Sequence, residues 1–346
     1  MFYLIFPVFL LSFMLTGLVR QYALSRNILD IPNQRSSHTL PVPRGGGMAF
    51  IIGFLIVVCI LAYIELISYR ETIAFLGSGL WIALLGFLDD HGHIPARWRL
   101  VGHFVAACFI LYWLGGMPAI VLGTWKLSSG FCLSFVAVIY LVWLVNLYNF
   151  MDGINGLASM EAVFVCLGGA LLYLLAGYPG QAILPMVLAA AVAGFLPWNF
   201  PSARIFMGDA GSGFLGLMLG ILSIEAATVD ALFFWCWLIL CGVFIVDATL
   251  TLLRRMIQGD KLYQAHRSHA YQQAARRYHT HTAVTLGVLM LNALWLLPMA
   301  IVVAKGYISG FLGLSIAYFP LIILAARLGA GKRDLSDYYP KNDQIS

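Results

Sequence analysis

Long apolar stretches alternate with short polar segments along almost the whole chain. Most of these stretches approach the ~20 residues that a helix needs to cross a bilayer. The pattern predicts an all-α polytopic membrane protein with about eleven transmembrane helices, of which the third, fourth and eighth are the shortest. The apolar stretches cover residues 1–19, 47–66, 73–88, 100–115, 131–149, 155–176, 181–198, 212–228, 231–253, 283–304 and 309–327.

The basic residues predict how these helices are oriented. An odd number of spans puts the two termini on opposite sides of the membrane. With the N-terminus outside, all but three of the 20 Lys and Arg residues fall on the inner side, and only Arg70, Lys126 and Lys305 fall outside. Because cytoplasmic loops carry an excess of Lys and Arg, we predict a periplasmic N-terminus and a cytoplasmic C-terminus.

The same pattern predicts the domain organisation. Residues 1–328 form one integral-membrane domain with its chemistry in cytoplasmic loops, and residues 329–346 form a polar cytoplasmic tail. Residues 1–19 have no basic segment before them and no small-residue cleavage site after them. They therefore predict a retained first span and not a signal peptide.

Composition agrees with a membrane protein and excludes a soluble one. The 346 residues are 61% hydrophobic and 10% charged, whereas soluble domains carry about 25% charged residues. The six cysteines lie in apolar runs without Cys-x-x-Cys spacing, which predicts neither disulfides nor a zinc site. The net charge of +5 is explained by orientation and lipid headgroups, so nucleic acid is not an expected partner.

The most polar stretch, residues 146–157, follows an apolar run. It contains Asn146, Asn149, Asp152 and Asn155. On a helix, Asn146 and Asn149 share a face, as do Asn149 and Asp152, because residues three apart are neighbours. A polar loop between two membrane helices would explain any one of these residues. The cluster as a whole favours a pocket.

Two further carboxylate motifs lie at helix ends. Adjacent Asp89 and Asp90 repel each other, which suggests a cation, a basic partner or a raised pKa. A solvated helix end, or an ion pair with Arg97 or Arg99, remains an alternative. Asp209 lies in a Gly-rich turn where backbone can approach a ligand, and a carboxylate beside phosphate is favourable when Mg²⁺ lies between them.

Basic groups accompany these carboxylates. His266, Arg267 and His269 could bind a diphosphate, although the surrounding loop could equally be positive-inside charge. Arg44 lies in a Gly-rich segment. Asp247 is an intramembrane carboxylate that needs a partner, for which Arg254 or Arg255 is suitably spaced. Carboxylates and basic groups at a membrane surface fit magnesium-assisted phosphoryl transfer between a nucleotide substrate and a lipid.

These motifs, in this order, resemble a known family. Asn-x-x-Asn-x-x-Asp-Gly-Ile-Asn-Gly-Leu, Gly-Phe-Leu-Asp-Asp, Met-Gly-Asp-x-Gly-Ser and the late His/Arg loop are similar to those of the polyprenyl-phosphate N-acetylhexosamine-1-phosphate transferases, of the glycosyltransferase family 4 type. The resemblance runs from about Asn33 to His269. It implies a Mg²⁺-dependent enzyme, with Mn²⁺ as an alternative metal, that transfers HexNAc-1-phosphate from a UDP-sugar to undecaprenyl phosphate and releases UMP.

The resemblance also implies roles for residues. Asp209 and Asn149 would bind the metal, and Asp152 would belong to the nucleotide and metal site. Asp89 or Asp90 would place or deprotonate the lipid phosphate, so the catalytic set is Asp89, Asp90 and Asp152. The substrate-binding set is Asn146, Asn149, Asn155, Arg44, His266, Arg267 and His269.

Several finer expectations follow from the same resemblance. The enzyme would lie in the bacterial inner membrane with its active site facing the cytoplasm. Whether it forms a homodimer is left undecided by the sequence. The late loop reads His-Arg-Ser-His and lacks the consecutive histidines of many relatives, which leaves the donor sugar open among GlcNAc and 6-deoxy sugars such as FucNAc or QuiNAc. The product would start O-antigen in lipopolysaccharide biosynthesis. One alternative class is a lipid or solute transporter, but transporters place ionisable groups near the bilayer midplane. A second alternative is a membrane scaffold without catalysis.

Overall fold

The computed structural model describes residues 2–32, 40–92, 94–123, 125–260 and 266–332. Residues 333–346 of the expected tail lie outside this range. The first half of the chain forms η1 (Phe2–Leu4), α1 (Ile5–Ser25), α2 (Gly47–Tyr63), α3 (Tyr69–Gly92), α4 (Ala96–Leu114), α5 (Phe131–Met151) and α6 (Leu157–Leu175). The second half forms α7 (Ile183–Asn199), α8 (Gly208–Val229), α9 (Ala231–Leu240), α10 (Gly242–Ile257), α11 (Ala270–Tyr278), α12 (His281–Leu291), η2 (Asn292–Leu296), α13 (Leu297–Ala304) and α14 (Gly310–Leu328).

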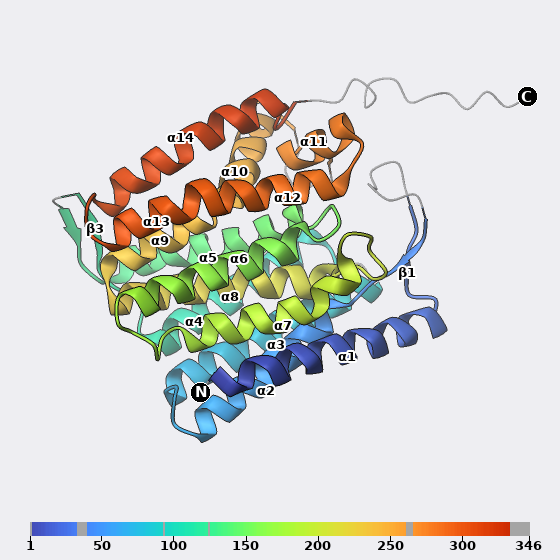
Figure 1. Ribbon diagram of the computed structural model, residues 1–346, viewed down its shortest axis with the longest axis horizontal. Coiled ribbons are helices and arrows are strands. Elements are labelled where there is room, and N and C mark those ends of the chain that lie inside the picture. The colour runs from blue at the N-terminus through green and yellow to red at the C-terminus, as the bar shows by residue number, and fades with distance from the viewer. Residues whose placement is uncertain (1, 33–39, 93, 124, 261–265, 333–346) are drawn as a thin grey trace, which may run out of the picture.

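Long helices run back and forth between two ends of one bundle (Figure 1). One end carries the antiparallel hairpin of β1 (Leu29–Asp30) and β2 (Val42–Pro43), together with α11. The opposite end carries the antiparallel hairpin of β3 (Ile120–Leu122) and β4 (Trp125–Leu127). The connections that hold the sequence-predicted motifs therefore gather at the β1–β2 end.

All eleven apolar stretches are helical, but not all have the length and hydropathy of a span. Seven helices in the described chain are long and apolar enough to cross a membrane, and α9 with α10 adds an eighth if this pair, bent by 69°, is one span. The helices α2 and α7 have 17 residues each, and Arg97, Arg99 and His103 make the start of α4 polar. These helices make the chain a multi-pass membrane protein. The number of eleven spans and the orientation of the termini stay predictions.

Helix α8 lies at the centre of the bundle and touches its neighbours closely. A Cβ on Gly86 of α3 would stand 2.4 Å from Ala210 Cα, and one on Gly47 of α2 would stand 2.4 Å from Gly211 Cα. Only glycine permits backbones to approach this far, a device common among membrane helices. These contacts hold the end of α3, with Asp89 and Asp90, against the start of α8, with Asp209.

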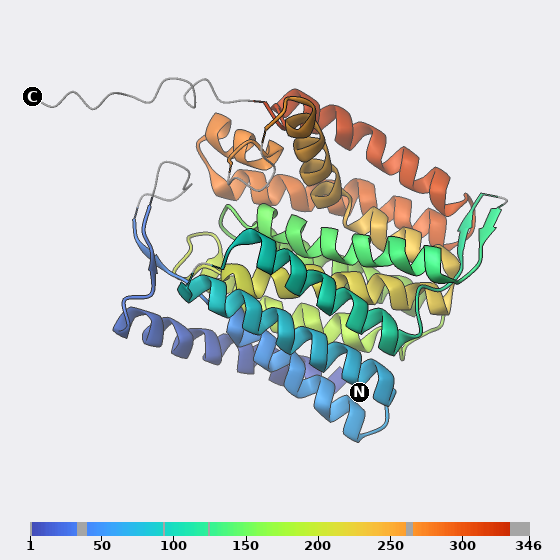
Figure 2. The same cartoon turned by 180° about the vertical axis from the view of Figure 1, so that it is seen from behind.

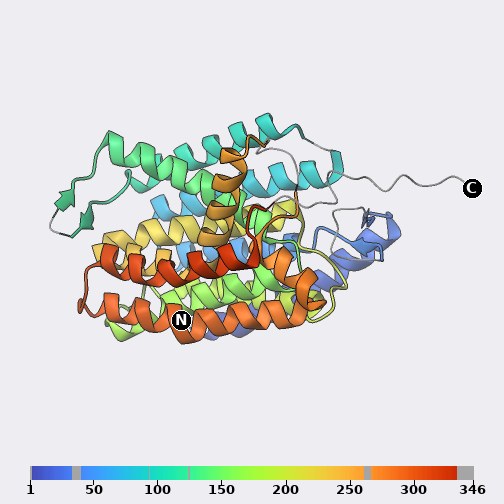
Figure 3. The ribbon, with the colours of Figure 1, turned by 90° about the horizontal axis from the view of Figure 1, so that it is seen from above.

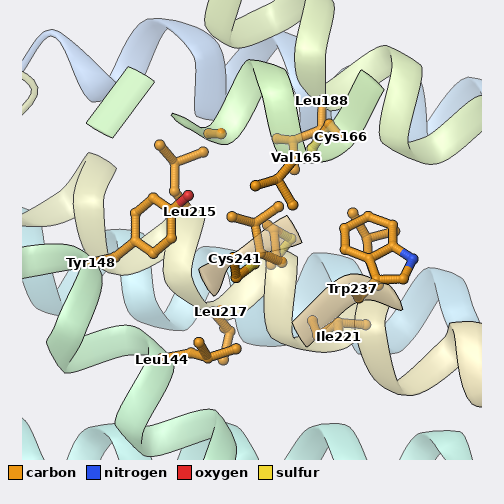
Figure 4. Packing of buried hydrophobic residues seen from close by; sticks show 14 of the residues in the cluster. Leu144, Tyr148, Val165, Cys166, Leu188, Leu215, Leu217, Ile221, Trp237 and Cys241 are labelled. Atoms are coloured by element: carbon orange, nitrogen blue, oxygen red, sulfur yellow. The ribbon is translucent and has the colours of Figure 1, made fainter. Parts of the chain in front are cut away.

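Behind this region the helices pack through apolar side chains (Figure 4). Tyr148 of α5, Leu215 of α8 and Trp237 of α9 point into a shared interior with residues of α6 and α7. Trp237 and Tyr148 are among the largest fully buried side chains. Because lipid is as apolar as these residues, close packing and not the hydrophobic effect holds such helices together. The result is a firm base for the polar end.

The cysteines form no disulfide, as predicted. Cys166, Cys236 and Cys241 are buried packing residues, but Cys59, Cys108 and Cys132 are exposed, so apolar sequence context alone did not reveal their positions.

Candidate active site

A cavity of about 220 Å³ opens at the β1–β2 end of the bundle. It is built where α3 and α5 end, where α8, α11 and α12 begin, and where β1–β2 approaches them. The sequence-predicted residues that line it are Arg44, Asp90, Asn149, Asp152, Asn155 and Asp209.

The loop between α5 and α6 is held in place by an amide side chain. Asn199, at the end of α7, accepts a hydrogen bond from Gly156 N at 2.8 Å and donates to Ile205 O at 3.0 Å. Gly156 has φ +73°, which favours glycine, and a Cβ there would collide with the Phe200 ring. This loop thereby presents Asp152 and Asn155 to the cavity.

Asp90 holds the start of α8. Its two carboxylate oxygens accept from the backbone N–H groups of Asp209 at 3.2 Å and Ala210 at 3.5 Å. A negative charge is favourable at a helix N-terminus, where N–H groups lack intrahelical partners. Arg44 Nη1 lies 4.0 Å from the Asp90 carboxylate, and Arg44 Nη2 donates to the Asp90 carbonyl.

Arg99 bridges two of the other carboxylates. Its Nη1 donates to Asp209 Oδ2 at 2.9 Å and also to Asp89 Oδ2. Asp89 Oδ1 accepts from Ile94 N at 2.7 Å. The ion-pair alternative raised for Asp89 is therefore present in the structure. Adjacent Asp89 and Asp90 do different things, because one pairs with Arg99 and the other caps a helix.

Asp152 has no such partner within the described chain. Burial raises the pKa of its carboxyl well above the usual range, and the nearby charges of Asp209 and Asp90 add to the shift. Asn149, one helical turn before it, lines the same cavity. Four carboxylates, those of Asp30, Asp90, Asp152 and Asp209, thus line one space with the Asn149 amide and the Arg44 guanidinium.

This set could hold a hard divalent cation. Oxygen ligands from Asn149, Asp152 and Asp209 suit Mg²⁺, which takes one or two carboxylates and fills its remaining positions with water and phosphate oxygens. Among the described residues, no group of three or more His, Cys, Asp or Glu side chains is arranged to hold a metal ion. Water and phosphate oxygens would have to supply the remaining ligands.

The late loop differs from expectation. Of the described residues that line the cavity, none is His266, Arg267 or His269. His269 is 2% exposed, and its ring stacks on Phe150 with centroids 6.0 Å apart. Burial lowers the pKa of His266 to about 3, helped by nearby His269 and Arg255. The structure thus places the loop beside the cavity wall.

Asp247 explains how that loop is anchored. Its carboxylate accepts from Ala270 N at 2.8 Å and Tyr271 N at 2.9 Å, and it lies 3.5 Å from His269 Nδ1. The expected pairing with Arg254 or Arg255 is wrong. Arg254 donates to Ala330 O, and Arg255 pairs with Asp260. Asp247 is therefore the cap of α11 and joins it to α10.

Four polar cavity residues were missed at the sequence level. They are Asp30, Asn199, Gln272 and His281. Gln272 stands three residues after His269, and Asn199 precedes a Phe-Pro pair at a helix end, so each lay near a visible signal. Asp30 and His281 lie in no recognisable sequence motif. Only the fold brings them together.

A second, smaller cavity of about 50 Å³ adjoins the first. Asn149 and Asp209 line both cavities. The predicted residue Asn146 lines this smaller cavity and is absent from the lining of the larger one. The site therefore has two compartments with a common wall.

Comparison with known proteins places the chain in a family. The glycosyl transferase family 4 model matches residues 72–227, which include Asp90, Asn149, Asp152 and Asp209. A decaprenyl-phosphate N-acetylglucosaminephosphotransferase of Mycobacterium tuberculosis (strain H37Rv) is 30% identical over 318 residues, covering 80% of this chain and 76% of the relative. The chain belongs to glycosyl transferase family 4.

Two further relatives match long stretches of the chain. A probable undecaprenyl-phosphate N-acetylglucosaminyl 1-phosphate transferase of Bacillus subtilis is 30% identical over 265 residues, 75% of this chain and 73% of the relative. A phospho-N-acetylmuramoyl-pentapeptide-transferase of Moorella thermoacetica is 31% identical over 240 residues, 64% of this chain and 72% of the relative. The family resemblance seen in the motifs is confirmed.

Proposed function

We propose that this family 4 chain transfers HexNAc-1-phosphate from a UDP-sugar to undecaprenyl phosphate. The relatives named above carry this type of activity in their names, with a polyprenyl phosphate as acceptor. The observation that carries the proposal is the cavity at one end of a membrane bundle, where Asn149, Asp152 and Asp209 face a common space. Carboxylates beside apolar helices suit a reaction between a charged soluble donor and a lipid acceptor.

The bonds of this reaction balance without another reactant. An oxygen of the lipid phosphate bonds to the sugar-bearing phosphorus of the donor. The bond from that phosphorus to the oxygen bridging to the nucleotide breaks, and UMP leaves with the electron pair. The acceptor phosphate is already an anion at neutral pH, so we favour direct attack over a covalent enzyme intermediate.

The residues would divide the work by position. Asn149, Asp152 and Asp209 would hold Mg²⁺, which, when bound, neutralises the donor diphosphate. Arg44, with its Nε atom lacking a partner in the described chain, would bind the diphosphate by forked hydrogen bonds. Asp90 would keep the start of α8 in place, and Asp89 would orient Arg99.

The finer features of the enzyme follow from the sequence. The excess of basic residues at the β1–β2 end supports an active site that faces the cytoplasm of a bacterial inner membrane. Relatives named for N-acetylglucosamine make UDP-GlcNAc the first donor to test, followed by the 6-deoxy sugars. O-antigen initiation is the proposed biological use.

The test is transfer of labelled sugar phosphate from a panel of UDP-HexNAc donors to undecaprenyl phosphate by purified protein. We expect lipid product and UMP with Mg²⁺, none with EDTA, and a loss of at least ~100-fold in Asp209→Asn because one oxygen ligand loses its charge. Asp230→Asn is the matched control, since Asp230 follows the other end of α8 and only caps α9.

A folded protein that gives no lipid product with any donor would contradict the proposal. Uptake of a lipid or solute into vesicles by the same preparation would then establish the transporter alternative.

A further inference from the structure

The smaller cavity lies on the membrane side of the site, among α3, α4, α5 and α8. Helix α4 packs against α3 and α5 at the edge of the bundle (Figure 2). Its outward face is apolar and open, since Leu100 is 43% exposed, Val101 50% and Phe104 38%. A membrane lipid can therefore lie directly beside this compartment.

The lining of the smaller cavity has two characters. Ile82, Leu85 and Phe150 form an apolar part. The polar part is made by Arg99, His103, Asn146 and Asn149 together with two carboxylates, Asp89 and Asp209, both of which pair with Arg99. One water needs at least ~10–15 Å³ of such space, so about 50 Å³ admits roughly the four oxygens of a phosphate. A phosphate attached to a hydrocarbon chain matches the apolar wall and the donors of Arg99 and His103, because the Asp89 and Asp209 charges are already paired with Arg99.

The hydrogen bonds of Asn146 determine where His103 carries its proton. Asn146 Nδ2 donates to Val142 O at 2.7 Å, and a carbonyl can only accept, so this atom is the amide nitrogen. The same nitrogen lies 3.2 Å from His103 Nδ1, which must then accept. The neutral ring therefore carries its proton on Nε2, which remains available as a donor.

We propose that the smaller cavity receives the phosphate of the polyprenyl phosphate acceptor, and that His103 Nε2–H binds it beside Arg99. Asn146 is a positioning residue that fixes the His103 tautomer. This inference rests on the proposed function. In this arrangement the donor lies in the larger cavity and the acceptor in the smaller one. Their phosphates meet at Asn149 and Asp209, which line both cavities.

The experiment separates acceptor binding from donor binding. For purified His103→Leu in detergent, KM for undecaprenyl phosphate rises at least ~10-fold, the effect of losing a hydrogen bond to a charged group, while KM for the UDP-sugar stays unchanged. His103→Gln, which keeps an N–H donor, recovers most of the acceptor affinity. Asn146→Leu raises the acceptor KM by a smaller factor.

Tyr140→Phe is the matched control on α5. It removes a buried hydrogen bond to Ser223 away from both cavities and leaves the acceptor KM unchanged. If His103→Leu does not purify folded, judged by a thermal shift with the UDP-sugar, His103→Asn takes its place because the shorter amide cannot reach.

Two results overturn the inference. One is an unchanged acceptor KM in the His103 variants, and the other is an equal rise in both KM values. Either result would arise while the wild-type protein forms lipid product, so the proposed function would stand. A wild type that forms no product from any donor would instead defeat the proposed function itself.

Discussion

Glu161 and Asn292 form a polar pair deep between α6 and the π-helical turn η2. Asn292 Nδ2 donates to Glu161 Oε2, and the two side chains are 2% and 1% exposed. Glu161 Oε1 and Asn292 Oδ1 find no partner in the described chain. Buried polar groups depend on their hydrogen bonds, so each residue here relies on the other.

Removing one member of this pair should cost more than removing both. Asn292→Leu leaves the Glu161 carboxyl without its donor and should lower the free energy of unfolding by about 1–3 kcal/mol. Glu161→Leu combined with Asn292→Leu should recover most of that loss, as measured by thermal unfolding in detergent. A double variant as unstable as the sum of the single variants would contradict this account.

At the residue scale, sequence patterns identified which residues belong to the site, but they did not identify which residues contact one another. Asp90, Asn149, Asp152 and Asp209 were singled out from their motifs, and the fold brings them to one cavity. Asp247 was recognised as needing a partner, but helical spacing pointed to the wrong ones. One partner, Thr251, lies one turn further along α10, but the others come from the start of α11, and spacing along α10 contains no information about that helix.

At the scale of elements, the approach of α3 to α8 sets the site. Gly86→Ala should push these helices apart, because its Cβ would stand 2.4 Å from both the Ala210 Cα and N atoms. The Asp90 cap on α8 would be lost, and displacements near 1 Å can cost ~100-fold in rate. We expect about this loss in the transfer assay.

Gly92→Ala provides the comparison within the same helix. A Cβ on Gly92 would meet no atom within 4 Å, so this variant should retain wild-type transfer. Equal activity of the two variants would show that the α3–α8 contact is not what aligns the carboxylates.

Hydropathy predicted the helices but not their directions. The apolar stretch 231–253 reads as one span, yet the chain bends by 69° between α9 and α10, and α10 crosses the other helices steeply (Figure 3). An apolar run reports only that a segment avoids water. Both arms of the bend pack against α14, which lies far along the sequence.

At the scale of the whole molecule, the orientation can be tested with single cysteines. Cys59, Cys108 and Cys132 are exposed and are first replaced by Ala. In intact cells, a thiol reagent that cannot cross the membrane should then label Lys305→Cys, but should label Ser202→Cys only after permeabilisation. Both positions are exposed, and they lie at opposite ends of the bundle. The reverse labelling pattern would overturn the predicted topology.

The lining of the larger cavity is drawn from distant parts of the chain, from Asp30 on β1 to His281 at the start of α12. During synthesis, the early helices leave the ribosome long before the last wall residues exist. A nascent chain that stops before α12 therefore has no complete pocket. The wall of the larger cavity is therefore completed only when one of the last helices has been made and has packed against the rest of the bundle.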